Sequence, residues 1–123
     1  MTEFRLSNLT LIDLVELVAK RMDDDPSVAL FGVWFDVYGL YDMVAELKIT
    51  VMSDKNLLLT HTPVLSHTRD QMKVAELLAF LTEFLRAFPQ YSTYYMWREV
   101  FEMSEPLMDF EVSPGELFET IIR

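Results

Sequence analysis

Two histidines and an aspartate come closest, in type and spacing, to residues that could bind a metal ion. His61 and His67 are six residues apart, with Pro63 between them, and Asp70 follows three residues later. A zinc site needs three or four converging ligands, and a histidine pair spaced across a proline-containing loop is a weak pattern for one. We therefore interpret His61 as a loop residue and His67 as a neighbour of a helix start, and we expect no metal and no other cofactor.

Paired carboxylates for acid–base catalysis can be drawn from the 20 acidic residues, but only Asp36 lies in an apolar segment of the kind that perturbs a catalytic acid. We interpret Asp36 as a residue that faces a turn or an edge, or pairs with a base. The chain has three glycines, and no G-x-S-x-G, phosphate-binding loop or dinucleotide-binding pattern occurs in it. The sequence thus predicts a protein that is not an enzyme.

The acidic residues of the C-terminal third form a more distinctive pattern. Residues 99–123 carry seven acids and one base, a net charge of −6 against −10 for the whole chain. Ordinary surfaces mix both signs and uncompensated charge repels itself, so a concentrated acidic surface indicates a cationic partner. Tyrosine and tryptophan, although typical of a core, are also frequent at interface hot spots. We expect a basic protein surface to be bound by Glu99, Glu102, Glu105, Asp109, Glu111, Tyr94 and Trp97.

The amino-acid composition indicates which partners the protein can have and in which compartment it is found. The chain is 51% hydrophobic, and this excess of apolar area for a small domain favours self-association as a homodimer. A pI near 4.5 predicts repulsion from nucleic-acid phosphates and from anionic membrane surfaces. The longest apolar run, Leu77–Leu81, is too short to cross a bilayer, and the first residues lack the basic and apolar regions of a signal peptide. Together with the absence of cysteine, these features favour a cytoplasmic location.

The first half of the sequence predicts a helix followed by a three-stranded meander. Thr10 and Asp13 form a capping box for a helix over Leu11–Met22, which has one apolar face. Val28–Tyr38 is ambiguous: its aromatic and β-branched content favours a covered strand, while Asp25-Pro26 is also a fair helix start. Strict alternation predicts a half-buried strand over Ala45–Val51, and residues 53–56 form a turn into a strand over Leu57–Thr62.

The second half predicts a long helix, two strands and a short helix. Thr68 and Gln71 form a capping box for a helix over Thr68–Phe88, whose narrow polar stripe indicates cover on more than one side. An aromatic-rich strand is expected over Tyr91–Met103, with a helix as the alternative, and a strand with one acidic face over Met108–Val112. Ser113-Pro114-Gly115-Glu116 is a further capping box, predicting a C-terminal helix.

These elements give the order α-β-β-β-α-β-β-α. We expect one α+β domain with an antiparallel sheet of about five strands and helices packed beside it. The function we expect is a non-enzymatic protein-binding module of the inhibitor or antagonist type, such as a phage-encoded inhibitor, a DNA mimic or an immunity protein. The order of elements, the size and the pI also resemble those of class I type III secretion chaperones. That resemblance implies the alternative of a dimer that binds an extended client segment through an apolar groove.

Overall fold

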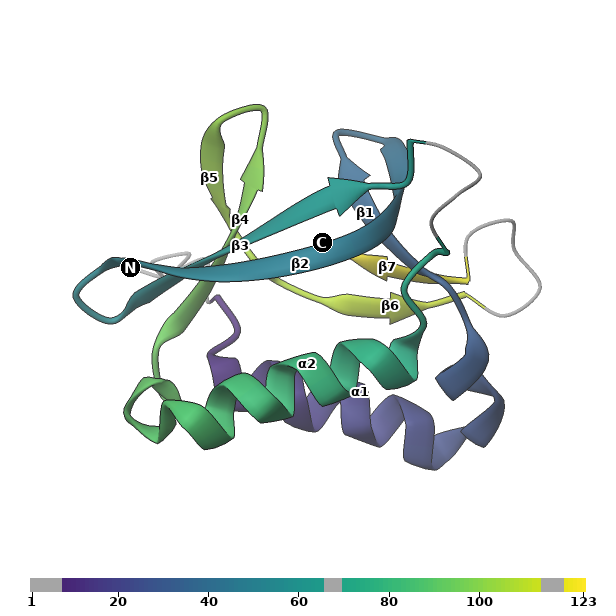
Figure 1. The fold of residues 1–123 in the computed structure, drawn as a ribbon, viewed down its shortest axis with the longest axis horizontal. Coiled ribbons are helices and arrows are strands. Elements are labelled where there is room, and N and C mark those ends of the chain that lie inside the picture. The colour runs from purple at the N-terminus through teal and green to yellow at the C-terminus, as the bar shows by residue number, and fades with distance from the viewer. Residues whose placement is uncertain (1–7, 66–69, 114–118) are drawn as a thin grey trace, which may run out of the picture.

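A pair of helices lies along one side of a strongly curled sheet in the computed structural model, which describes residues 8–65, 70–113 and 119–123 (Figure 1). The helices are α1 (Leu11–Asp24) and α2 (Val74–Ala87), and two short 3-10 helices are η1 (Pro26–Leu30) and η2 (Pro89–Tyr91). The strands are β1 (Val33–Val37), β2 (Leu40–Ser53), β3 (Asn56–Pro63), β4 (Tyr95–Val100), β5 (Met103–Pro106), β6 (Phe110–Val112) and β7 (Thr120–Ile122).

The sheet is mixed, and the predicted antiparallel sheet of about five strands with three helices is wrong. Seven strands pair in the order β5-β4-β3-β2-β1-β7-β6. β1–β2, β2–β3, β4–β5 and β6–β7 pair in antiparallel fashion, whereas β3–β4 and β1–β7 are parallel. Parallel neighbours need a long crossover, and α2 supplies it between β3 and β4. The element order therefore also departs from the one on which the secretion-chaperone resemblance depended.

The capping box predicted for the first helix is confirmed. Thr10 Oγ1 accepts a hydrogen bond from the Asp13 backbone N–H at 3.2 Å, and the Asp13 carboxylate accepts one from the Thr10 N–H at 3.1 Å. The helix buries Leu11, Leu14, Val15 and Val18. The ambiguous segment that follows proves to be divided: Pro26–Leu30 is a 3-10 helix capped by the Asp25 side chain, and only Val33–Val37 is a strand. The strand predicted for this segment and the alternative of a helix are therefore each correct for part of it.

The predicted hairpin between β2 and β3 is present. Ser53 pairs with Asn56 across the turn, and the strand predicted over Ala45–Val51 is the middle of the 14-residue β2. The pairing register shifts between Val44 and Glu46, where a bulge allows the long strand to bend. Because β2 bends, Leu40–Met43 pair with β1 while Val44–Ser53 pair with β3, and the sheet curls.

The second helix begins at Val74, six residues after the predicted start at Thr68. Thr68 lies outside the described residues, and the Gln71 side chain, expected to complete its capping box, instead donates to the Val33 carbonyl at 2.9 Å. The backbone before α2 is extended because it pairs with the strands: Met72 N–H donates to the Val44 carbonyl and Val33 N–H to the Met72 carbonyl. Gly32 allows this approach, since a Cβ there would lie 2.5 Å from the Gln71 side chain.

Two further predictions near the C-terminus are wrong in part. Tyr91–Met103 is neither one strand nor a helix, because β4 ends at Val100 and reverses into β5. The start of the predicted C-terminal helix, residues 114–118, lies outside the described residues. Its expected apolar positions Ile121 and Ile122 lie in β7, a buried strand parallel to β1. Three β-branched residues in succession suit such a doubly covered strand.

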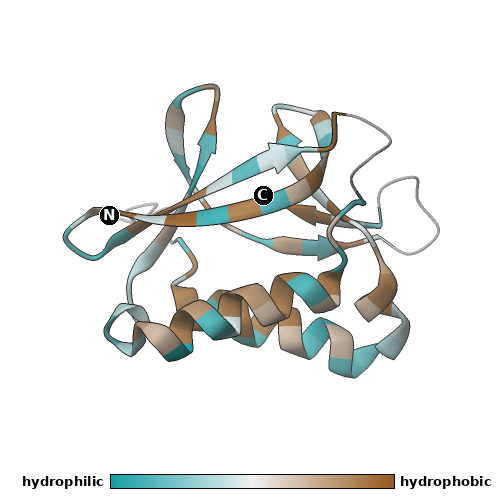
Figure 2. Cartoon of the chain, viewed as in Figure 1, coloured by the Kyte–Doolittle hydropathy of each residue, from teal (hydrophilic) through white to brown (hydrophobic). Residues whose placement is uncertain are grey.

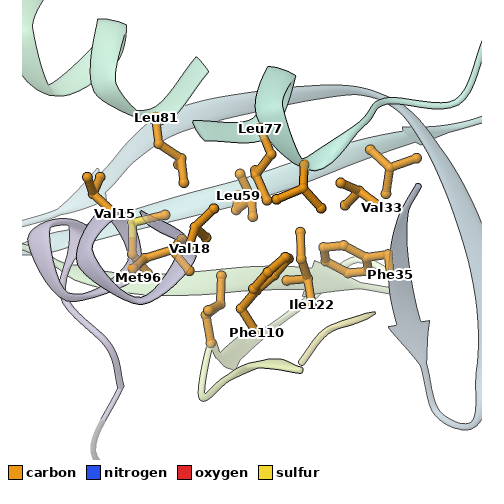
Figure 3. Packing of buried hydrophobic residues seen from close by; sticks show 14 of the residues in the cluster. Val15, Val18, Val33, Phe35, Leu59, Leu77, Leu81, Met96, Phe110 and Ile122 are labelled. Atoms are coloured by element: carbon orange, nitrogen blue, oxygen red, sulfur yellow. The ribbon is translucent and has the colours of Figure 1, made fainter. Parts of the chain in front are cut away.

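The hydrophobic core lies between the helix pair and the inner face of the curled sheet. Figure 3 shows Leu77 and Leu81 of α2 and Val15 and Val18 of α1 facing side chains that come from the strands. The large side chains that are fully buried include Phe35, Phe110, Leu57, Leu59, Met96 and Ile122. Figure 2 shows apolar stretches on both helices and along β7. With the helices covering one side of the sheet, the hairpins β1–β2 and β4–β5 extend away from them (Figure 1).

Candidate functional site

The tips of the hairpins β1–β2 and β4–β5 have an unusual backbone. Tyr38 and Gly39 have φ of 52° and 85°, and Phe101 and Glu102 have φ of 49° and 64°. Two successive residues with positive φ form a type I′ turn, which normally selects Gly, Asn or Asp. A residue with a side chain pays roughly 1 kcal/mol for the left-handed conformation. Three of the four central residues here carry that cost, and conformational strain of this kind clusters at functional sites.

The same two tips expose large apolar side chains. Tyr38 is 54% exposed, Leu40 69%, Phe101 66% and Met103 58%; we call these four residues the tip patch. The Tyr38 and Phe101 rings are stacked, with centroids 5.7 Å apart and planes inclined by 29°. The two hairpins, more than 60 residues apart in the sequence, therefore present one joined surface.

A buried arginine connects the two hairpins beneath the tip patch. Arg98 of β4 is 7% exposed, and its guanidinium donates a hydrogen bond to the Asp36 carbonyl of β1. It also lies 3.4 Å from the Glu105 carboxylate and 5.3 Å from the centroid of the Phe35 ring. The other Glu105 oxygen accepts a hydrogen bond from the Tyr38 hydroxyl. Because this bond to Glu105 favours the protonated phenol, the pKa of Tyr38 is raised above its ordinary value.

A second polar pair packs against Phe35. The His61 ring stacks on the Phe35 ring with centroids 4.0 Å apart, and its Nε2 lies 2.9 Å from Asp42 Oδ2. The His61 side chain is 11% exposed and Asp42 40%. His61 therefore joins β3 to β2 and packs in the polar layer under the tips. The interpretation of His61 as a loop residue is wrong, and the strand predicted over Leu57–Thr62 correctly contains it. His67 lies outside the described residues, and in residues 8–65, 70–113 and 119–123 no group of three metal-ligating side chains is present.

Asp36 has the structural role that the sequence indicated. Its Oδ1 accepts a hydrogen bond from the Gly39 N–H at 2.8 Å, inside the β1–β2 turn. Its Oδ2 lies 3.6 Å from Arg123 Nε, so the carboxylate both faces a turn and pairs with a base.

The acids predicted to bind a partner do not form one surface. Arg98 faces Glu105 across β4–β5 on the inner side, so Glu99, paired with Ser104, faces the outer side. Glu102 is exposed at the hairpin tip. Glu111 pairs with Arg123 at 3.2 Å, and the Asp109 carboxylate accepts a hydrogen bond from the Phe110 N–H at 2.8 Å. Of the five acids, the structure places Glu102 and Glu105 beside the tip patch.

The two aromatic residues predicted for the interface lie away from the tips. Trp97 is half-buried, and its indole N–H donates to Asn56 Oδ1 at 2.7 Å. Tyr94 is half-buried, with its ring 4.8 Å from that of Tyr91. Sequence reasoning missed the members of the tip patch. The Tyr38-Gly39 pair was a usable turn signal, but no residue type marks the turn at Phe101-Glu102.

None of the helices in the described part of the chain is long and apolar enough to cross a lipid bilayer. Comparison with protein families, with curated proteins and with solved structures found no match to this chain.

Proposed function

We propose that this chain is a non-enzymatic protein-binding module, of the inhibitor or antagonist type, that binds a basic partner protein through the tip patch. The observation that carries the proposal is the joined pair of strained hairpin tips, with stacked Tyr38 and Phe101 more than half exposed. Exposed aromatic and long apolar side chains on a rigid support resemble the residues that dominate binding energy at protein interfaces. The backbone strain at Phe101 and Glu102 is explained if the turn orients these side chains toward a partner.

The support beneath the patch favours binding without rearrangement. Arg98 holds β4–β5 to β1, and the Tyr38–Glu105 hydrogen bond fixes one ring of the stacked pair. A surface whose side chains are already ordered loses less conformational entropy on association. The polar groups under the patch bind one another. This favours a structural role for them over a catalytic one.

The charge of the chain supports a basic partner. The net charge is −10, and Glu102 is an exposed carboxylate between two members of the tip patch, Phe101 and Met103. Negative charge at the rim of an apolar patch steers a cationic partner and mainly raises the association rate. We infer the antagonist class from the small size, the net charge and the exposed tip patch.

The experiment is a quantitative comparison of capture by three forms of the protein. Immobilised parent protein, Phe101→Ser and Leu30→Ser are exposed to extract of the native host, and captured proteins are measured by mass spectrometry. Leu30 is a similarly exposed apolar residue on η1 and serves as the matched control. We expect a partner captured by the parent and by Leu30→Ser to be lost with Phe101→Ser, and its association rate to fall as salt rises. Equal capture by Phe101→Ser, or loss with Leu30→Ser alone, would show that binding occurs elsewhere.

A further inference from the structure

The stacked rings of the tip patch offer a particular kind of contact. Tyr38 and Phe101 are each more than half exposed, and their rings meet at a shallow angle of 29°. The face of an aromatic ring is electronegative, so an exposed face attracts a cation within about 6 Å of its centroid. Glu102 follows Phe101 directly at the tip and is exposed, so the residue next to Phe101 in the turn carries a solvent-accessible carboxylate.

We infer that the partner seats an arginine side chain on the Tyr38–Phe101 pair, with its guanidinium paired to Glu102. This inference rests on the proposed function and names the chemistry of the group that the site binds. Charge complementarity selects a cation, because the exposed ionised group at the β4–β5 tip is an acid and Arg98, the base beneath it, is buried and pairs with Glu105.

The layer beneath the tips shows the same chemistry inside the protein. There the Arg98 guanidinium lies over the Phe35 ring and beside the Glu105 carboxylate. A planar guanidinium can stack on a ring and donate to a carboxylate in its own plane, whereas an ammonium is a compact and more strongly hydrated charge. At the surface, Tyr38 and Phe101 supply aromatic rings and Glu102 supplies a carboxylate, the same kinds of group that contact Arg98 below. Arginine is therefore favoured over lysine.

The test uses two blocked peptides as probes, hexaarginine and hexalysine, which carry equal charge. Each is titrated into isotope-labelled protein while the aromatic NMR signals of Tyr38 and Phe101 are followed. We expect hexaarginine to shift these signals and to bind roughly two- to five-fold more tightly than hexalysine. Phe101→Leu should abolish this preference. Phe88→Leu, which alters an exposed phenylalanine at the end of α2, should retain it.

A pair of acid variants tests the part assigned to Glu102. Glu102→Gln should weaken hexaarginine binding and lower its salt dependence, because one charge contact is removed. Glu83→Gln, an exposed acid on α2, should leave both unchanged. Circular dichroism establishes that each variant is folded.

The inference is overturned if the two peptides bind with equal affinity, or if Phe101→Leu keeps the preference for arginine. It is also overturned if the shifts concentrate at another acidic segment, such as Asp23–Asp25. These outcomes are distinct from failure of the proposed function. If Phe101→Ser still captures the partner, the tip patch is not the binding site. If Phe101→Ser loses the partner while the parent protein binds hexaarginine and hexalysine equally well, the tip patch is still the binding site. The group that it binds is then not an arginine side chain.

Discussion

Replacing Arg98 with methionine should loosen the connection between the two hairpins by an amount that the structure allows us to estimate. The hydrogen bond from the charged guanidinium to the Asp36 carbonyl contributes about 1.5 kcal/mol. The partly exposed pair with Glu105 adds about 1 kcal/mol, and the contact with the Phe35 ring about 0.5 kcal/mol. Against this, the buried Arg98 Nε has no hydrogen-bond partner in the described part of the chain, and its removal returns about 1 kcal/mol.

The net expectation for Arg98→Met is a loss of about 2 kcal/mol in the free energy of unfolding. Packing adds little to this loss, because the methionine replaces most of the packing of the arginine stem. For a domain of this length that corresponds to a melting temperature lower by roughly 8 °C. Urea unfolding followed by circular dichroism measures the free energy, and calorimetry measures the temperature. Arg86→Met on α2 is the control, since an exposed substitution should change stability by less than about 0.5 kcal/mol.

A double-mutant cycle separates the pair from the other contacts. Arg98→Met combined with Glu105→Gln should give a coupling energy of about 1 kcal/mol, because each single change removes the same interaction. The reasoning would be refuted by a loss below about 0.5 kcal/mol for Arg98→Met, or by the absence of coupling with Glu105. Either result would mean that the hairpins are joined by other contacts.

Four further predictions follow. Glu105 raises the folded-state pKa of Tyr38 above 10.0. The stability that the Tyr38–Glu105 hydrogen bond contributes is therefore present below about pH 10 and is lost as pH rises through the folded pKa. Near-ultraviolet titration of Glu105→Gln should show one phenol ionising at lower pH than in the parent. Glu102→Gly should raise stability by about 0.5–1 kcal/mol in thermal melts, since glycine adopts positive φ without strain. Thr10→Ala should cost about 1 kcal/mol by removing the cap of α1, and unchanged denaturant midpoints would contradict this. Sedimentation should give about twice the 14.4 kDa chain mass, because the half-buried apolar residues of α2 leave area for a second copy, and a monomer at tens of micromolar would refute it.

The features that were predictable from the sequence are those fixed by near neighbours. The capping box joins two residues three positions apart, so Thr10 and Asp13 could be identified without knowledge of the fold. The alternation over Ala45–Val51 reflects a strand with one buried face, and residues 53–56 carry turn-forming side chains. In each case the interaction that decides the structure lies within one short stretch.

The features that were missed depend on distant segments. The extended backbone at Gln71 and Met72 follows from pairing with Val33 and Val44, which competes successfully with a helical capping signal. The reversal at Phe101-Glu102 uses residues that rarely form type I′ turns, so no local pattern indicated it. The tip patch could not be predicted for the same reason: Tyr38 and Phe101 become neighbours only after the sheet has curled.

The position of β7 has a consequence for how the chain folds during synthesis. β7 follows every other described element in the sequence, yet it lies inside the sheet, between β1 and β6. Its partner β1 is almost 90 residues earlier, so this pairing closes a very long loop and contributes to slow folding. Until residue 122 has left the ribosome, β1 lacks a neighbour along one edge, and an unpaired strand can pair with another chain. The edge of β1 therefore stays open to pairing with another chain from the emergence of Val37 until that of Ile122.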